Sequence, residues 1–130
     1  MLLAALLLGV ASMGCGEQQG VPRAAPPSPR PGGVVGDAAD GTTVHLVRGQ
    51  YLQVRLSRGS YDPPVSSRPA FVVRRHTVGG YPGTHPVEAN FQALAIGPAE
   101  ITATTDAGCL HGRPRCLIPE RVWTLHVVVR

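Results

Sequence analysis

The central part of the chain alternates short apolar runs with turn residues, a pattern of β-strands rather than helices. Residues 51–56 show it most clearly, because Leu52, Val54 and Leu56 alternate with Tyr, Gln and Arg, the two-residue period of a strand with one buried face. Further strands are expected over 42–47, 70–77, 87–95, 99–105 and 122–129. No segment joins a sustained helical period to capping residues. A turn signal at 48–50 separates 42–47 from 51–56, so we expect these two strands to form a hairpin.

The candidate core consists of apolar side chains that share the inward face of their strands. They are Leu46, Leu52, Val54, Leu56, Phe71, Val73, Phe91, Ile101, Trp123, Leu125 and Val127. Short strands broken by turn residues are typical of two packed sheets, and about 90–95 residues are enough to bury such a core. We therefore expect an all-β, immunoglobulin-like antiparallel β-sandwich, with a small barrel as the alternative.

The N-terminal part of the chain differs from this pattern. Residues 2–11 form an uninterrupted apolar run, which is shorter than the roughly 20 residues of a membrane span and is typical of a signal peptide. Residues 16–36 carry five prolines without hydrophobic periodicity, which predicts a disordered, extended linker. We expect a signal peptide over 1–14, a lipidated cysteine and Pro/Gly-rich tether over 15–36, and the folded domain over 37–130.

The segment Ser12-Met13-Gly14-Cys15 follows the apolar run and resembles a bacterial lipobox. In that motif a signal peptidase cuts before the cysteine, whose thiol receives a diacylglycerol. The motif usually has Leu and a small residue where this chain has Ser12 and Met13. The resemblance implies lipidation of Cys15 and an anchor on the extracytoplasmic face of the cell membrane. Ordinary cleavage near Gly14, which gives a secreted protein, and a retained N-terminal helix are the alternatives.

Three cysteines leave one unpaired, which in an exported chain needs an explanation. Setting Cys15 apart for lipidation lets Cys109 and Cys116 form a disulfide, as an oxidising compartment allows. It would close a short loop between the last two strands and stabilise the domain by roughly 2.5 kcal/mol in the chain-entropy account. A metal site using both cysteines and His111 is the alternative. It fits poorly, because zinc-binding cysteines usually lie two to four residues apart.

The loop that this disulfide closes carries His111, Arg113 and Arg115. A short, charged, cross-linked loop at the end of a sandwich is typical of a binding surface. We expect these three side chains, together with Tyr61 in the loop 57–69, to be binding residues. A stapled connection with no partner is the alternative.

The positive charge is spread along the chain rather than gathered on one element. The formal net charge of +4 comes from arginine without any lysine, in a composition rich in Ala, Gly, Pro and Val, which is typical of a high-GC genome such as an actinobacterial one. Nucleic-acid binding usually shows as basic residues clustered on one element with aromatics between them. We therefore expect no nucleic-acid partner.

No catalytic or metal-binding constellation stands out in the sequence. The serines of 57–69 lack the context of a nucleophile elbow, and the histidines lack the i, i+4 spacing of a helical metal site. Asp37 and Asp40 lack the spacing of a calcium loop and lie beside the linker, where solvation is the default. We expect no enzyme, no cofactor and no metal.

Two stretches, 43–56 and 91–103, resemble the chagasin-type inhibitors of cysteine proteases, and the valine-rich strand at 122–129 continues the resemblance. It implies an immunoglobulin-like sandwich, often exported. The inhibitory loops depart from that family. Its Asn-Pro-Thr-Thr-Gly loop is replaced by residues 57–64, and its Arg-Pro-Trp loop has a counterpart only in Arg113-Pro114, with Arg115 in place of Trp.

Taken together, these features predict a membrane-anchored envelope lipoprotein with a non-catalytic β-sandwich. Its loops at 57–69, 78–86 and 109–116 would bind a protein or an envelope polymer. The resemblance adds a chagasin-like protease inhibitor as one alternative, and a purely structural spacer domain is the other.

Overall fold

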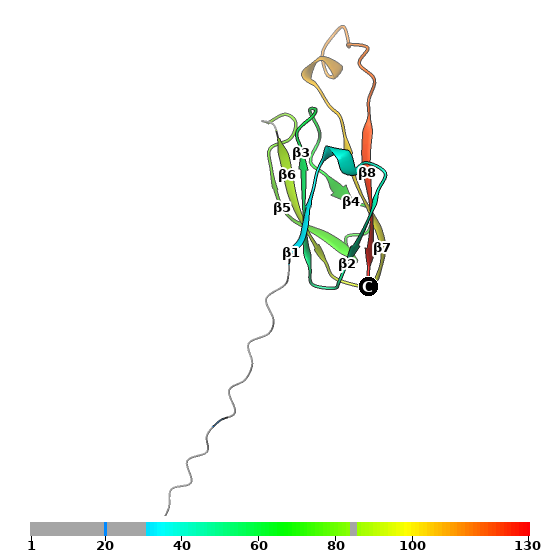
Figure 1. The fold of residues 1–130 in the computed structure, drawn as a ribbon. Helices are drawn as coiled ribbons and strands as arrows, with labels where there is room; N and C mark the ends of the chain where they lie inside the picture. Colours follow the sequence, from blue (N-terminus) through cyan, green and yellow to red (C-terminus); the bar gives the residue numbers. More distant parts are fainter. Residues whose placement is uncertain (1–19, 21–30, 84–85) are drawn as a thin grey trace, which may run out of the picture.

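Strands in two face-to-face sheets form the domain in a computed structural model that describes residues 20, 31–83 and 86–130 (Figure 1). The first sheet has the order β1-β3-β6-β5, with bounds Pro31–Val35, Tyr51–Leu56, Val87–Ala93 and Val72–Val78. The second has the order β2-β8-β7-β4, with bounds Thr43–Leu46, Val122–Val129, Gly97–Thr104 and Val65–Ser66. Two short 3-10 turns, η1 (Asp37–Ala39) and η2 (Gly108–Leu110), lie in connections. The predicted all-β sandwich is confirmed. The predicted signal peptide, Cys15 and most of the tether lie outside the described residues.

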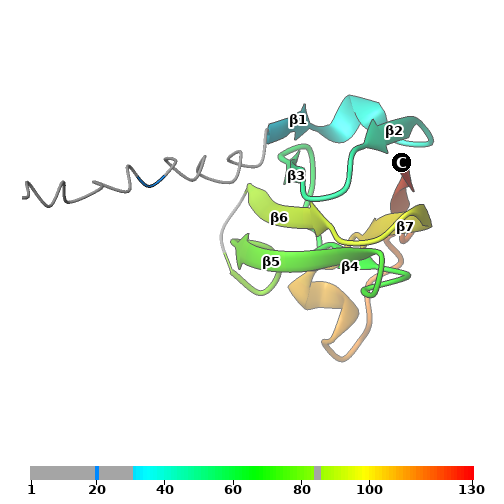
Figure 2. The ribbon, with the colours of Figure 1, turned by 90° about the horizontal axis from the view of Figure 1, so that it is seen from below.

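The core fills the space between the two sheets, which the view along the strands shows as separate layers (Figure 2). Alternate residues of each strand point inward, so that β6 and β8 follow a strict buried and half-buried alternation over much of their length. The predicted core side chains are fully or almost fully buried, with two exceptions: Val73 on β5 and Phe71 just before that strand. The predicted bounds 51–56 and 122–129 coincide with β3 and β8.

The exception is strand β5, where the prediction chose the wrong face. Phe71 and Val73 were expected to point inward, but Val72 is the fully buried residue and both neighbours are only half-buried. Phe71 lies in the turn before the strand, where its own amide donates to the carbonyl of Arg68 at 2.9 Å. Because side chains alternate with a period of two, a start displaced by one residue exchanges the two faces.

The predicted hairpin of 42–47 and 51–56 is wrong, because the two strands lie in different sheets. β2 pairs with β8 in parallel, whereas β3 pairs with β6 antiparallel. The turn between them crosses from one sheet to the other, and Gly49 at its tip donates its amide to the carbonyl of Ala93 at 2.7 Å. A hairpin turn and a turn that changes sheets leave the same local pattern in the sequence. With β1 and β3 also parallel, the sandwich is mixed rather than wholly antiparallel.

Strand β1 begins at Pro31, inside the segment predicted as tether. β1 joins the sheet through its backbone, pairing with β3 from Pro31 opposite Tyr51 to Val35 opposite Val54. Gly32 permits this approach, since a Cβ there would lie 2.7 Å from the carbonyl oxygen of Tyr51. β1 joins the sheet by backbone pairing and has no alternation of apolar residues in its sequence. The sequence analysis therefore did not predict it.

The topology gathers the longer connections at one end of the sandwich, which we call the loop end (Figure 1). It carries the connections β1–β2, β3–β4, β5–β6 and β7–β8, as the parallel and antiparallel pairings require. The opposite end carries the turns 47–50, 67–71 and 94–96, together with the entry at Pro31 and the C-terminus.

Two carboxylates tie the β1–β2 connection to both sheets. Asp37 accepts hydrogen bonds from the Ser57 amide at 3.0 Å, the Ser57 hydroxyl at 3.2 Å and the Arg58 amide at 3.1 Å, at the end of β3. Asp40 accepts from the amide of Thr124 on β8 at 2.8 Å. These side chains are therefore structural acceptors and not the simply solvated carboxylates that the sequence predicts.

Removal of the Asp37 carboxylate should weaken the domain most at neutral pH. Burial raises the pKa of Asp37, but the hydrogen bonds from Ser57 and Arg58 outweigh this and hold it below its usual range. The stability it contributes is thus present above the ordinary pKa of Asp and is lost as the pH falls through the lowered value. We expect Asp37→Ala to lower the free energy of unfolding by about 1–2 kcal/mol near neutrality, with a smaller difference in strong acid, measured by urea denaturation. Equal losses at both pH values would contradict this account.

Candidate functional site

Three connections from separate parts of the chain meet at the loop end. They are the β3–β4 loop (57–64), the β5–β6 loop (79–86) and the β7–β8 loop (105–121). Residues 84–85 of the second loop are not described. The β7–β8 loop is the longest and projects beyond the sandwich (Figure 1).

Backbone hydrogen bonds join the three loops, with the β3–β4 loop in the middle. Tyr61 forms an isolated antiparallel bridge with Thr105, and the Asp106 amide donates to the Ser60 carbonyl at 2.8 Å. On the other side, the Tyr81 amide donates to the Tyr61 carbonyl at 2.7 Å. The bases of the loops therefore keep fixed relative positions, although their sequences carry few strand residues.

Gly80 lets the β5–β6 loop lie directly on the β3–β4 loop. Its φ of +85° is in the left-handed region, and a Cβ there would come within 3.1 Å of both the Tyr61 carbonyl oxygen and Cγ2 of Val87. A residue with a side chain would meet both a backbone penalty and a steric one at this position.

The predicted disulfide between Cys109 and Cys116 is confirmed. It lies at the outer part of the β7–β8 loop, with a Cα–Cα distance of 5.3 Å, and the Cys116 amide also donates to the Cys109 carbonyl at 3.0 Å. At the base of the loop, the Arg121 amide donates to the hydroxyl of Thr105 at 2.8 Å. The projecting loop is thus closed twice, once by sulfur and once by hydrogen bonds.

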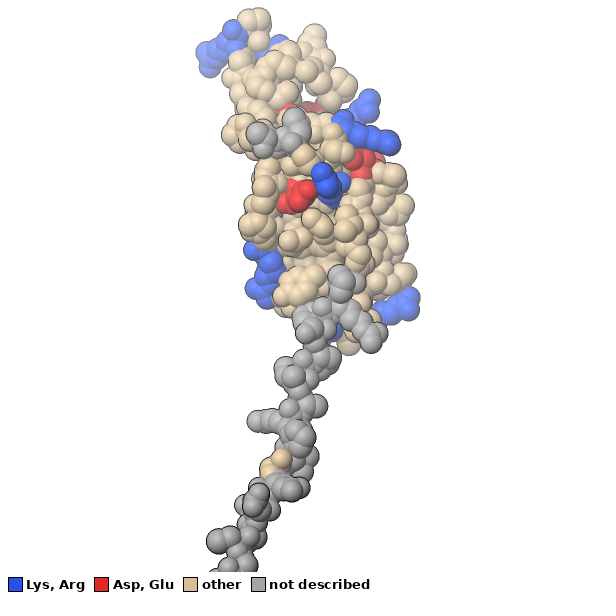
Figure 3. Space-filling view, turned by 60° about the vertical axis from the view of Figure 1, so that its left-hand side comes forward, with Lys and Arg blue, Asp and Glu red and all other residues tan. Residues whose placement is uncertain are grey.

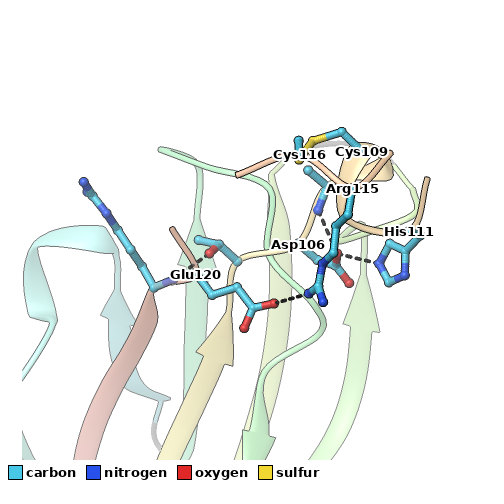
Figure 4. A network of polar contacts seen from close by, with 9 residues as sticks. Asp106, Cys109, His111, Arg115, Cys116 and Glu120 are labelled. Carbon is cyan, nitrogen blue, oxygen red and sulfur yellow. Dashed lines mark hydrogen bonds and ion pairs between the residues drawn. A yellow bond between two sulfur atoms is a disulfide. The ribbon is translucent and has the colours of Figure 1, made fainter. Parts of the chain in front are cut away.

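A network of polar contacts lies within the β7–β8 loop (Figure 4). His111 Nε2 lies 2.7 Å from Oδ1 of Asp106, and its ring stacks on Tyr81 of the β5–β6 loop at 5.3 Å between centroids, with an interplanar angle of 13°. Farther out, Arg115 and Glu120 form an exposed ion pair at 3.4 Å. The imidazole is therefore a contact between two loops rather than a free side chain at a tip.

Two neighbouring carboxyl groups, on different loops, have displaced pKa values. Burial raises the pKa of Asp62, and Asp106 raises it further by charge repulsion and by sharing a hydrogen bond. Burial would also raise the pKa of Asp106, but the hydrogen bond from His111, the amide of Ala107 and the charge of His111 outweigh this and lower it. The pKa of Asp62 therefore lies above that of Asp106.

The predicted binding residues separate into two kinds of position. Tyr61 is half-buried against the core and carries the backbone contacts of the loop end. Arg113 and Arg115 are exposed on the disulfide-closed part of the loop, and Figure 3 shows basic side chains at that far end as well as at several places over the sandwich. His111 lies between these two zones, in contact with Asp106 and Tyr81.

Sequence reasoning missed an apolar feature of the same loop. Leu117 is fully exposed and Ile118 is about half exposed, at 52%. Ile118, Leu110 and Ala107 also line a groove of about 290 Å³ that runs beside Ser60 of the β3–β4 loop. The sequence signal for this exposed apolar feature was the pair of adjacent apolar residues in a segment rich in turn-forming and charged residues.

The loop end combines exposed apolar and cationic side chains with one histidine–carboxylate pair. Among the described residues no group of three or more His, Cys, Asp or Glu side chains could hold a metal ion. The His111–Asp106 pair resembles a base with its orienting carboxylate, but the hydrogen bonds found in the described ranges connect no hydroxyl group to His111. No helix in that part of the chain is long and apolar enough to cross a membrane.

Comparison with solved structures finds the same fold in small all-β proteins. The crystal structure of the cysteine protease inhibitor EhICP2 from Entamoeba histolytica matches with a TM-score of 0.56 at 15% identity, covering 78% of this chain and 99% of that one. The solution structure of amebosin matches with a TM-score of 0.52 at 14% identity, covering 75% and 97%. No protein-family model and no curated protein sequence matches the chain. At these identities the likeness shows a shared fold.

Substitution of Gly80 should separate steric from backbone effects at the junction of two loops. Gly41 is the matched control, because its φ of +73° is similar but no atom lies within 4 Å of a Cβ built there. We expect Gly80→Ala to lower the free energy of unfolding by about 1 kcal/mol more than Gly41→Ala does, through overpacking, measured by urea denaturation. Equal costs for the two substitutions would show that the close contact with Tyr61 is unimportant.

Proposed function

We propose that this chain is a non-catalytic binding protein that docks its loop end into the cleft of a papain-type cysteine protease and blocks it. The observation that carries the proposal is the assembly of three loops side by side at one end of a sandwich. A solved protein with the same fold, EhICP2, is a cysteine protease inhibitor. The chagasin-type resemblance of the strands supports the same reading.

The shape and rigidity of the loop end suit such a role. The β7–β8 loop projects beyond its neighbours (Figure 1), and its disulfide and backbone hydrogen bonds limit the conformations it would have to give up on binding. Loops ordered before association lose less conformational entropy when they bind. A projecting, restrained loop beside two shorter ones has the form of a wedge.

The side chains that would make the contacts differ from those of the chagasin-type family. Arg113, Arg115, Leu117 and Ile118 are all exposed on the projecting loop. Arginine and large apolar side chains supply most of the binding energy in interfaces when their partner buries them. We therefore assign the contact surface to the segment closed by the disulfide and to the two residues that follow it, rather than to an aromatic tip.

Inhibition of papain by the full chain is the direct test of this function. We expect inhibition at micromolar concentration or better, and we expect Arg113→Glu combined with Arg115→Glu to weaken it at least about tenfold, since both side chains face the cleft in the proposal. Arg48→Glu, on the turn at the opposite end of the sandwich, is the control and should leave inhibition unchanged.

Two results would overturn the proposal. The first is the absence of inhibition at about 100 micromolar protein, far above the range of a specific inhibitor. The second is an equal loss of inhibition in the Arg48 variant and the double variant, which would indicate a nonspecific effect of charge.

We also propose that the protein is held at the cell envelope by a lipid on Cys15, presenting the same loop end to a protein or an envelope polymer. One observation favours this arrangement: the chain enters the domain at Pro31, at the end opposite the loops (Figure 1). An anchor on the N-terminal side would therefore leave the loop end facing away from the membrane. A spacer domain would need no such exposed contact surface.

The mass of the mature N-terminal peptide tests the anchor. In a bacterial host we expect a diacylglycerol adduct on Cys15, and we expect Cys15→Ser to move the protein from the membrane fraction to the medium or the soluble fraction. The domain itself should fold equally well in both forms, as judged by its disulfide. An unmodified N-terminus at or after Cys15 would instead make the protein a secreted one.

A further inference from the structure

A second, smaller pocket lies at the loop end, on the side of the β1–β2 connection, and we call it the Trp123 pocket. Its volume is about 200 Å³, and it shares only Arg121 with the apolar groove beside Ser60. Its walls come from the β1–β2 connection, the β3–β4 loop and the start of β8. The lining residues are Asp37, Asp40, Arg58, Tyr61, Arg121, Val122 and Trp123.

Trp123 brings an unpaired hydrogen-bond donor to this pocket. The residue is only 3% exposed, and its indole N–H is buried without a hydrogen-bond partner in the described part of the chain. Buried polar groups in proteins are almost always hydrogen-bonded, because leaving one unpaired costs free energy. An indole N–H donates and cannot accept. The group that satisfies Trp123 must therefore be an acceptor.

Two guanidinium groups line the same pocket. The hydrogen bonds and ion pairs found over residues 31–83 and 86–130 include none from the side chain of Arg58 or Arg121. Their backbone amides are held, at 3.1 Å by Asp37 and at 2.8 Å by Thr105. The pocket thus has two cations whose points of attachment are fixed and whose donors are available.

The carboxylates in the wall do not satisfy these donors. Asp37 spends both oxygens on the Ser57 and Arg58 amides and the Ser57 hydroxyl, and Asp40 accepts from the Thr124 amide. Their charges still reach the pocket. Burial and then the charges of Asp37 and Asp40 raise the pKa of Tyr61 against the opposing charge of Arg121. The phenol therefore stays protonated at neutral pH and adds a further donor to the wall.

We infer that the Trp123 pocket binds a single carboxylate group, which accepts hydrogen bonds from the Trp123 indole and from the guanidinium groups of Arg58 and Arg121. A carboxylate is planar and accepts at two oxygens, as a guanidinium group prefers. A doubly charged phosphate fits less well, because Asp37 and Asp40 repel its second charge.

The size and the walls of the pocket limit what can carry the carboxylate. Typical small-molecule sites measure about 300–1,000 Å³, so about 200 Å³ admits a group of the size of one side chain. The indole nitrogen is covered, and the exposed side chains of Arg58 and Arg121 supply the movable wall through which a ligand reaches it. A small free acid and the C-terminus of a peptide both present the required group.

The indole N–H signal of the full chain tests the site directly, because Trp123 is the only tryptophan in the protein. We titrate with propionate, with N-acetyl-dialanine, and with the amide of the same dipeptide, at constant ionic strength. We expect a saturable shift of the indole signal with a dissociation constant of about 10 mM or tighter for a carboxylate probe, and none with the amide. Tighter binding of the peptide acid than of propionate assigns the site to a chain terminus, and equal binding assigns it to a free acid.

Four variants separate the pocket from the general charge of the protein. Arg58→Gln and Arg121→Gln should each weaken binding roughly three- to tenfold, since each removes a charge-assisted hydrogen bond at an exposed position. Arg48→Gln removes the same charge at the opposite end of the sandwich and should leave the dissociation constant unchanged. Trp123→Phe keeps an aromatic ring without the donor and should weaken binding about two- to tenfold, measured by calorimetry. Urea denaturation checks its fold, and the arginine variants decide the question if it does not fold.

The inference is overturned if neither acid shifts the indole signal saturably up to about 50 mM, where any binding is too weak to be specific, or if the amide shifts it equally. It is also overturned if inorganic phosphate binds more tightly than both acids, or if Arg48→Gln weakens binding as much as the pocket variants do. The site does not depend on the proposed function. Carboxylate binding by a chain that does not inhibit papain would count against the proposed function alone.

Discussion

Burial of alternate side chains between two sheets is the interaction on which the rest of this structure depends. Every core residue in the described part of the chain is apolar, and Phe91 lies opposite Leu52 at the centre of one sheet. Such burial fixes the register of each strand, because a shift by one residue would turn its apolar face to solvent. Because the strands are fixed in this way, the positions at which the connections begin and end are fixed as well. The core therefore sets the geometry of the loop end.

The alternation of apolar and polar residues predicts the strands whose bounds depend on this burial. It does not predict which strands pair with one another. β3 and β8 have the bounds expected from their alternation, since one face of each is wholly apolar. β1 was missed because Pro31–Val35 joins the sheet by backbone pairing, beside a glycine. The change of sheet between β2 and β3 was missed because alternation tells which face is buried, but not which sheet buries it.

The same division applies to the candidate site. Cysteine count and compartment were enough to predict the disulfide of Cys109 with Cys116. The contacts of Tyr61 with Thr105 and of Tyr81 with His111 had no signal in the sequence, because the residues of each pair lie in distant segments and only the strand order brings them together. The role of His111 as a binding residue stays a prediction, and the structure adds contacts to Asp106 and Tyr81 that the sequence did not indicate.

The parallel pairing of β1 with β3 has a mechanical consequence. The chain enters at Pro31, and β1 runs from there toward the loop end alongside β3. A pull on the N-terminal side, opposed by a partner gripping the loops, would act along the strand axis. Hydrogen bonds in a parallel pair are evenly spaced and slant across the strands, so the bonds of β1 would be loaded together in shear rather than opened one after another. Strand β1 would therefore bear tension as a unit.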